Sequence, residues 1–398
     1  MHGSADPIEG SRHPARSARP GGIDLGEVPS PCFVLEEARL RENLALLRKV
    51  ERASGARILV ALKGFAVPAV FPLIREHLSG AAVSALNEAR LAFEELGGDI
   101  HACAPAYLSR EIDEILEYVS HLTFNSLSQW ERYRSRVLRR DDVSAGIRIN
   151  PEHSEVRTAL YDPAQPGSRL GVTAEELHGR LPEGIDGLHF HSLCECDADA
   201  LERTLTVIET TCHPLLEQAS WLNLGGGHLI TRPGYDVETL VRLVRNLRDR
   251  YGVEVILEPG AAVAWKTGVL AALVADIVEH RGIRTLILDV SFSAHMPDCL
   301  EMPYRPAVRG ARDPTPGERG CRLGGSTCLA GDYVGDYVFD TPPAVGDRIV
   351  FEDMMHYTLV KSTYFNGVPH PSIGIWREEG GFELLRRFGY EDYRDRLG

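Results

Sequence analysis

Two residues at the ends of apolar runs could carry chemistry. Lys63 follows the run RILVAL (57–62) and precedes Gly64. Burial at the end of a strand would lower the pKa of this lysine and leave a nucleophilic amine able to form a Schiff base, although a surface lysine is the more common case. Glu258 ends another apolar run and begins the turn Glu258-Pro259-Gly260. A buried carboxylate needs a cationic partner, either an arginine or the protonated nitrogen of a pyridine ring.

Two further segments offer binding groups. The triplet Gly225-Gly226-Gly227 exposes backbone N–H groups without side chains, which suits a phosphate, and the alternative is a tight strand-to-helix turn. In His189-Phe190-His191 the two imidazoles project to the same side of a strand, so one of them could stack on a planar ring. A lone histidine is more often a core residue. Pyridoxal 5'-phosphate needs an amine for its aldehyde, a phosphate site, a carboxylate for its ring nitrogen and a platform for its ring. The lysine, the glycine triplet, the glutamate and a histidine could supply these four groups.

The surrounding sequence alternates strand-like runs with helical patterns between residues 36 and 267. The eight runs are Arg57–Leu62, Ala81–Ala85, Asp99–Ala104, His121–Asn125, Ala145–Asn150, Gly187–Ser192, Trp221–Gly225 and Val253–Glu258. This alternation predicts a (β/α)8 barrel of the TIM type, with a doubly wound open sheet as the alternative. In such a barrel the carboxyl ends of the strands form one rim, which brings Lys63, His191 and Glu258 together.

The rest of the chain follows a different pattern. Residues 268–398 contain β-rich runs, including Val269–Val278, Thr285–Leu288, Arg348–Phe351 and Tyr357–Lys361, and many Gly and Pro turns. We expect an antiparallel β domain here, joined by residues 29–35, in which Pro31–Leu35 would add a strand. Residues 1–28 are rich in Gly, Pro, Ser and Arg without apolar periodicity and are expected to be a disordered tail.

Composition argues against several classes of function. The 398 residues include 57 acidic and 43 basic side chains, for a net charge of −14, which disfavours nucleic acid or anionic membrane as a partner. No apolar run is long enough to span a bilayer and no secretory signal is visible, so we expect a cytoplasmic protein. The eight cysteines are scattered, with no CxxC pair, and predict reduced thiols and no metal site.

Several long motifs resemble the pyridoxal-phosphate-dependent decarboxylases that combine an alanine-racemase-like (fold type III) barrel with a C-terminal β domain. This group includes ornithine, arginine and diaminopimelate decarboxylases, and the chain looks most like its carboxynorspermidine (carboxyspermidine) decarboxylase branch. The motifs are PGSRLGV (166–172), HFHSLCE (189–195), LNLGGGHLITR (222–232), VILEPG (255–260), HMPDCLEMPYRP (295–306), RLGGSTCLAGDYVGDY (322–337) and FEDMMHYTLVKSTYFNG (351–367).

The resemblance implies a role for each of several residues. Lys63 would carry the cofactor, His191 would stack on its ring and Glu258 would pair with its nitrogen, while the phosphate would bind Gly226, Gly227 and the Tyr357 hydroxyl. Relatives are homodimers with shared sites, so Cys328 and Asp332 would enter the site of the other subunit. Contacts to the cationic substrate would come from Asp298, Glu301 and Asp332.

The activity implied is decarboxylation of carboxynorspermidine or carboxyspermidine to norspermidine or spermidine in polyamine biosynthesis, with Cys328 or Lys63 donating the proton. Alternatives are a decarboxylase of diaminopimelate, arginine or ornithine, a non-catalytic pyridoxal-phosphate carrier and a polyamine-binding regulator. The chain departs from ornithine decarboxylases at Ala261, where they have an arginine after the EPG motif, so another group must replace that phosphate contact.

Overall fold

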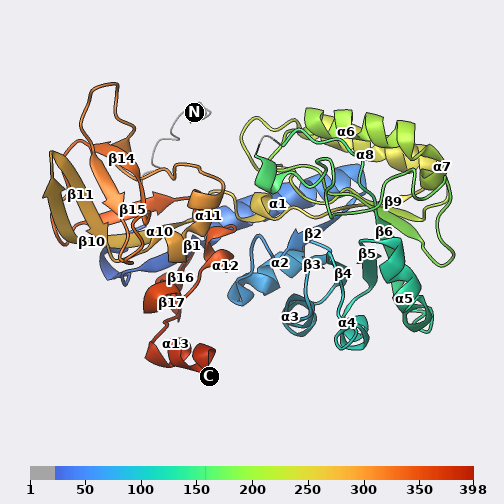
Figure 1. Ribbon diagram of the computed structural model, residues 1–398, viewed down its shortest axis with the longest axis horizontal. Coiled ribbons are helices and arrows are strands. Elements are labelled where there is room, and N and C mark those ends of the chain that lie inside the picture. The colour runs from blue at the N-terminus through green and yellow to red at the C-terminus, as the bar shows by residue number, and fades with distance from the viewer. Residues whose placement is uncertain (1–22, 157) are drawn as a thin grey trace. The chain divides into compact units, whose positions relative to one another are not determined.

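The computed structural model describes residues 23–156 and 158–398, which form two compact units (Figure 1). The first, called the barrel unit, comprises Leu35–Val269 and Asp353–Lys361. The second, called the sheet unit, comprises residues 23–34, Leu270–Glu352 and Ser362–Gly398. The unit boundaries lie within two residues of the expected ones at both ends of the barrel, but the return of residues 353–361 to the barrel unit was not anticipated.

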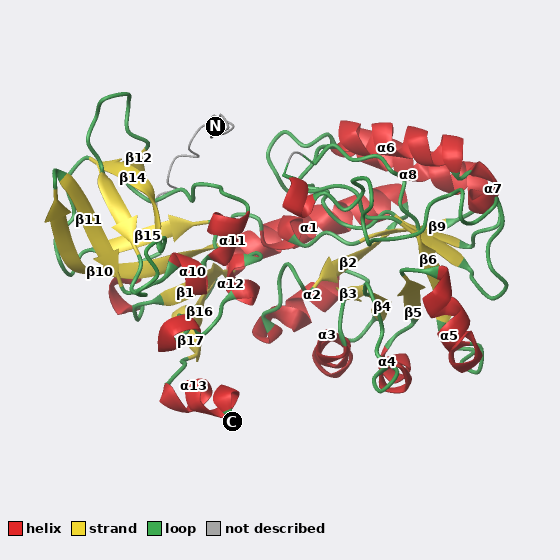
Figure 2. Ribbon diagram, in the orientation of Figure 1, coloured by secondary structure: helices red, strands yellow, loops and turns green. Residues whose placement is uncertain are grey.

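Eight parallel strands close into the barrel, each at one of the eight predicted runs (Figure 2). Their bounds are β2 (Arg57–Ala61), β3 (Gly80–Val83), β4 (Asp99–Cys103), β5 (His121–Phe124), β6 (Ser144–Arg148), β7 (Gly187–His189), β8 (Trp221–Asn223) and β9 (Glu254–Leu257). Pairing of β2 with β9 completes the ring, which excludes the open sheet. Because all strands run the same way, their carboxyl ends form a single rim.

Helices and short turns complete the barrel unit. They are α1 (Glu37–Ser54), α2 (Phe71–His77), α3 (Leu86–Leu91), α4 (Ile112–Tyr118), α5 (Leu127–Val137), α6 (Ala198–Thr211), α7 (His213–Leu216), α8 (Val237–Tyr251), α9 (Ala261–Ala264) and α12 (Thr358–Lys361), with short turns η2 (Pro68–Val70), η3 (Ala92–Leu96) and η4 (Ala159–Tyr161). Helix α8 shows the local logic, because Asp236 caps its start and Gly252, at φ 69°, ends it.

Aromatic rings fill the barrel at the amino-terminal end of its strands, which we call the barrel floor. Trp221 occupies the space above two glycines, since a Cβ at Gly187 would lie 2.0 Å from its ring and one at Gly146 2.2 Å. His101 and His121 stack beside it with ring centroids 3.8 Å apart, and the edge of Trp221 meets His121. The floor is therefore a packed core rather than a pore.

The sheet unit is built on a nine-stranded mixed sheet. The strand order is β12-β14-β13-β11-β10-β1-β16-β17, with β15 paired to β10. The bounds are β1 (Cys32–Glu36), β10 (Gly268–His280), β11 (Ile283–Leu288), β12 (Ala311–Arg312), β13 (Cys321–Gly324), β14 (Tyr333–Phe339), β15 (Arg348–Glu352), β16 (Ser372–Arg377) and β17 (Gly381–Arg386). Strand β1 joins it from the start of the chain as expected, whereas β11 and β13 pair in parallel, so the sheet is not wholly antiparallel.

Short helices complete the sheet unit, and one predicted strand is wrong. The helices are η1 (Leu25–Glu27), α10 (Phe292–His295), α11 (Pro297–Glu301), η5 (Phe365–Gly367) and α13 (Tyr390–Leu397). The expected strand Tyr357–Lys361 is instead helix α12 of the barrel unit, begun where the Lys361 N–H donates to the Tyr357 carbonyl. Of the expected tail, residues 1–22 lie outside the described part, and Val28 is buried. Among the described residues, no helix has the length and apolarity needed to cross a membrane.

Candidate active site

Lys63 lies in the turn that follows β2 at the carboxyl rim. Gly64 closes that turn by donating its N–H to the Ala61 carbonyl over 2.9 Å. The Lys63 side chain is exposed, so the expectation that the barrel mouth would desolvate this amine is wrong. Strand β2 ends two residues earlier, at Ala61. The amine is nevertheless part of the rim, because its positive charge lowers the pKa of Glu258.

Glu258, directly after β9, is a nearly buried carboxylate with a neutral neighbour. Its side chain is 11% exposed, and Asn223 at the end of β8 donates an amide N–H to Oε1 over 2.5 Å. Oε2 lies 3.8 Å from Nε2 of His189. Burial raises the pKa of Glu258 against the opposing effects of Asn223, Lys63 and Arg148. A cationic ligand atom would therefore stabilise this carboxylate.

His191 follows β7 and is held in one tautomer. The Gly226 N–H donates to its Nδ1 over 2.8 Å. Because a backbone N–H can only donate, Nδ1 must be the unprotonated nitrogen. Burial and the positive charges of Lys63 and Arg148 hold the pKa of His191 well below its ordinary value, so the ring is neutral. A fixed, neutral imidazole at the rim suits the stacking role that the sequence suggested.

The glycine triplet after β8 is packed too closely for any side chain. A Cβ at Gly226 would lie 2.5 Å from the Glu258 carbonyl, and one at Gly227, where φ is +85°, would lie 2.1 Å from the Leu193 carbonyl. The N–H of Gly226 is used by His191, so the expected phosphate contact through that group does not fit. The N–H of Gly227 has no partner among the described residues and is open to an anion.

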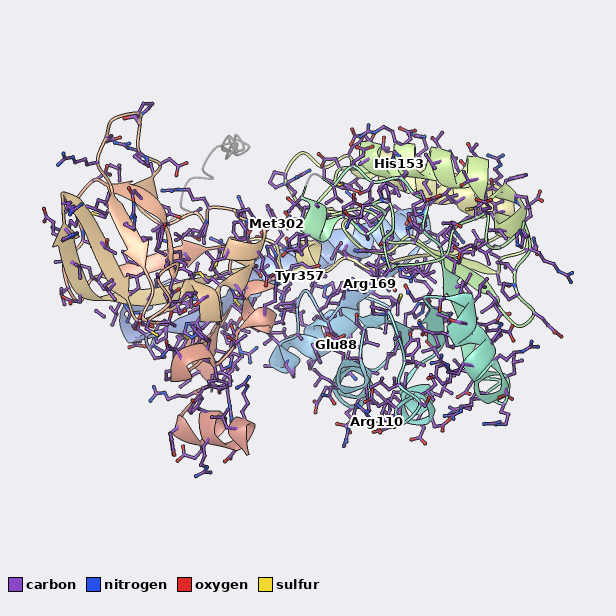
Figure 3. The ribbon with its side chains drawn as sticks, in the orientation of Figure 1. Glu88, Arg110, His153, Arg169, Met302 and Tyr357 are labelled. Atoms are coloured by element: carbon purple, nitrogen blue, oxygen red, sulfur yellow. The ribbon has the colours of Figure 1, made fainter. Side chains whose placement is uncertain are left out.

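Tyr357, labelled in Figure 3, belongs to the same rim because residues 353–361 return to the barrel unit. Its N–H donates to the Gly64 carbonyl over 2.8 Å, and its hydroxyl lies 3.4 Å from where a Cβ of Gly260 would stand. Tyr357 takes a left-handed φ of 54°, which turns the chain into α12. Burial raises the pKa of its hydroxyl, so the hydroxyl remains a hydrogen-bond donor.

These rim groups fit pyridoxal 5'-phosphate. The cofactor carries an aldehyde, a flat ring, a basic ring nitrogen and a phosphate. The amine of Lys63, the imidazole of His191, the carboxylate of Glu258 and the side-chain-free cradle at Gly227 with the Tyr357 hydroxyl offer one partner for each. Glu258 is the most specific of these partners, because its nearly buried carboxylate accepts a hydrogen bond from the neutral Asn223 amide and would be stabilised by a protonated pyridine nitrogen.

Residues of the sheet unit proposed to meet substrate fall into two local groups. Asp298, in α11, is buried and accepts a hydrogen bond from the Tyr304 hydroxyl over 2.6 Å, while Glu301 at the end of the same helix is exposed. Cys328 is exposed on the segment between β13 and β14, and its Sγ lies 2.9 Å from Oδ1 of Asn366. The Cys328 thiol is therefore not packed in the core of the sheet unit.

Asp332 differs from its expected role. It is 5% exposed, and its carboxylate accepts four hydrogen bonds. Oδ1 receives the N–H groups of Phe292 and Ser293, and Oδ2 receives both the N–H and the hydroxyl of Thr327. Both oxygens are thus engaged by the chain itself, which gives Asp332 the task of fixing the Cys328 segment rather than binding a substrate amine.

Two residues at the barrel rim and one residue beside Cys328 in the sheet unit escaped the sequence analysis. Asn223 and Arg148 end β8 and β6, so the rule that strand ends carry function could have identified them. Arg148 is buried and donates to the His191 carbonyl over 3.3 Å. Asn366 gave no comparable signal, because its contact with Cys328 joins residues 38 positions apart.

The chain is similar to several known proteins. Residues 32–355 match the family model described as "Pyridoxal-dependent decarboxylase, C-terminal sheet domain". A carboxyaminopropylagmatine decarboxylase of Synechocystis is 54% identical over 94% of this chain and 97% of its own. A carboxynorspermidine/carboxyspermidine decarboxylase of Campylobacter jejuni is 43% identical over 92% of this chain and 98% of its own.

Solved structures give the same result. The crystal structure of carboxynorspermidine decarboxylase from Campylobacter jejuni, complexed with norspermidine, matches with a TM-score of 0.85 and 42% identity, over 93% of this chain and all of that one. Diaminopimelate decarboxylase from Helicobacter pylori, with L-lysine, matches with a TM-score of 0.79 at 17% identity, over 93% of this chain and 96% of that one, which supports the fold alone. The chain belongs to the pyridoxal-phosphate-dependent decarboxylases of the alanine-racemase-like fold, and it is a carboxy-lyase of polyamine biosynthesis.

Proposed function

We propose that this enzyme removes the carboxylate of carboxynorspermidine or carboxyspermidine to give norspermidine or spermidine. The observation that carries the proposal is the similarity, over 93% of the chain, to a decarboxylase structure that contains norspermidine. These substrates join an α-amino acid end to a long cationic chain. The acidic protein, at a net charge of −14, is electrostatically suited to attract them.

On this proposal the rim residues bind and orient the cofactor. When bound, the cofactor would accept the electron pair that remains on the substrate after CO₂ departs. The amine of Lys63 would hold the cofactor through its aldehyde group. Glu258 keeps the ring nitrogen protonated, and the neutral His191 covers one ring face. The Gly227 N–H and the Tyr357 hydroxyl bind the phosphate, while Gly226 shapes the cradle.

The remaining roles belong to the sheet unit and to a second copy of the chain. We propose a cytoplasmic homodimer in which Cys328 of one subunit serves the site of the other and donates a proton to the substrate α-carbon. Asp298 and Glu301 would bind the distal ammonium groups, for which carboxylates are the natural partners. Asp332, with both oxygens engaged, would hold the Cys328 segment in place.

A second candidate substrate is carboxyaminopropylagmatine, favoured by the 54% identity to the Synechocystis enzyme. This molecule shares the amino acid end and ends in a guanidinium group instead of an ammonium. A carboxylate can bind a guanidinium through two parallel hydrogen bonds, whereas an ammonium offers a point charge. The acidic residues proposed for the distal end therefore accommodate either group, and kinetics must choose between them.

A substrate panel tests the proposal. The purified enzyme, loaded with pyridoxal phosphate, is given carboxynorspermidine, carboxyspermidine, carboxyaminopropylagmatine, diaminopimelate, ornithine and arginine, and CO₂ release is measured as kcat/KM. We expect one of the first two to be the best substrate. A preference for carboxyaminopropylagmatine would establish the second candidate, and turnover of diaminopimelate, ornithine or arginine alone would refute both. Lys63→Ala should abolish turnover and the visible absorbance of the bound cofactor, with Lys63→Arg as a control that keeps the charge.

A further inference from the structure

The segment that carries Cys328 is anchored at its base. It joins β13 to β14, and the carboxylate of Asp332 ties it to the first residues of α10, with distances of 2.7 Å to the Phe292 N–H and 3.0 Å to the Ser293 N–H. The Thr327 hydroxyl also donates to the same carboxylate, over 2.6 Å. The residue before Cys328 is therefore held firmly, although Cys328 itself is exposed.

Asn366 holds the tip of this segment from the other side. Its Oδ1 lies 3.1 Å from the backbone nitrogen of Cys328 and 2.9 Å from Sγ. The backbone N–H can only donate, so the amide atom facing it must be the oxygen rather than the nitrogen. An amide oxygen can only accept, so the sulfur that shares it must carry its hydrogen. The contact therefore selects the protonated thiol and points its S–H bond at Asn366.

The turn that presents Asn366 is built for that position. Asn366 has φ 60° and ψ 13°, a left-handed conformation that Asn tolerates better than most residues. Two residues before the turn η5, the Thr363 N–H donates to the Ala294 carbonyl in α10 over 2.7 Å. Helix α10 thus anchors both the Cys328 segment, through Asp332, and the turn that carries Asn366. This common base fixes the distance between thiol and amide.

We propose that Asn366 is a positioning residue that holds the thiol of Cys328 in one orientation, from which it donates its proton. The inference rests on the donor role of Cys328 in the proposed function. When the bond between the α-carbon and the carboxylate breaks, CO₂ leaves and its electron pair stays on the substrate. The S–H bond of Cys328 then breaks as the new C–H bond forms, and solvent water returns a proton to the thiolate.

Alkylation of the thiol tests the contact itself. Full-length wild type, Asn366→Gly and Asn366→Asp are treated with iodoacetamide across a pH series, and modification of the Cys328 peptide is followed by mass spectrometry. Glycine is chosen because it removes the amide without straining a left-handed backbone. Loss of one hydrogen bond of ordinary strength should speed alkylation about fivefold at neutral pH. Asn366→Asp should slow it, because a carboxylate disfavours a neighbouring thiolate. Unchanged profiles in both variants would overturn the positioning contact.

Measuring the turnover of the holoenzyme distinguishes the role of the Asn366 contact from the role of Cys328 as proton donor. We expect Asn366→Gly to lower kcat with little change in KM. In a Cys328→Ala background the same substitution should have no further effect on kcat, because both changes impair the same proton transfer. Additive losses in the double variant would refute the inference. Asn246→Ala, the same loss of an amide at an exposed position of α8, is the matched control. Full activity of Cys328→Ala would instead refute the donor role, whatever the alkylation profiles show.

Discussion

The stacked histidines of the barrel floor make the stability of the enzyme sensitive to acid. Burial, followed by the charge of Arg57, lowers the pKa of His121 from 6.5 to about 4. The folded chain therefore binds fewer protons at His121 than the unfolded chain does between these two pH values. The contribution is fully present above pH 6.5 and is lost as the pH falls toward 4. At pH 5 the loss from this residue amounts to about 2 kcal/mol.

The surroundings of His121 decide how it can be replaced. Arg57 opposes its protonation, Glu254 and Asp186 favour it, and His101 stacks on its face. Phenylalanine keeps the stack and the edge contact with the floor tryptophan but cannot take a proton. Its cost at neutral pH is the hydrogen bond between Nδ1 and the Ser120 hydroxyl, 3.1 Å long and worth about 1 kcal/mol.

Urea unfolding at pH 7 and pH 5, at one protein concentration, measures the effect for wild type and His121→Phe. We expect the wild type to lose about 2 kcal/mol more than the variant between the two pH values. His280→Phe, at an exposed histidine, should behave like the wild type because water surrounds that ring in both states. Parallel pH dependence in wild type and His121→Phe would refute the assignment of acid sensitivity to the floor.

Three other substitutions test the packing and the rim. Gly187→Ala should lower the free energy of unfolding by about 1–3 kcal/mol, measured with urea at pH 7, because its Cβ would overlap the Trp221 ring. Glu258→Gln keeps an acceptor for Asn223 but removes the charge, so kcat should fall on the order of 10²–10³-fold while the cofactor stays bound. Gly227→Ala, at φ +85° and against a backbone carbonyl, should weaken cofactor binding about 10- to 100-fold in a fluorescence titration. Wild-type values in any of these assays would contradict the corresponding contact.

The barrel was predictable because its signals are local. Each strand is a short apolar run bounded by turns, and a residue such as Lys63 or Glu258 can be placed at the rim by its position after such a run. The sheet unit was harder to predict, because its pairings join distant segments, as in the parallel contact of β11 with β13. The run Tyr357–Lys361 shows where prediction from residue type fails. Its β-branched and aromatic residues are typical of a strand, but a left-handed φ of 54° at Tyr357 leads into a helix.

Roles within the site were less predictable than positions. Asp332 was assigned to substrate because it is acidic and lies in a family motif, yet only the folded chain shows four donors on its carboxylate. The hydrogen bond made by the Gly226 N–H was equally hard to predict, because its acceptor, His191, is 35 residues away in the sequence. Which hydrogen bonds a group has already made depends on tertiary contacts that sequence spacing does not encode.

The same physical effect has opposite consequences at the two ends of the barrel. Burial lowers the pKa of His121 at the floor and of His191 at the rim. At the floor the neutral ring packs against its neighbours and bonds to the Ser120 hydroxyl, so its resistance to protonation is a liability in acid. At the rim it keeps the imidazole neutral beside Lys63 and Arg148, where an imidazolium would repel both cations and lose its Gly226 contact. His121→Phe should therefore reduce the loss of unfolding free energy at pH 5 without shifting the acid limb of the pH profile of kcat/KM. A shift of that limb would show that the two ends of the barrel are coupled.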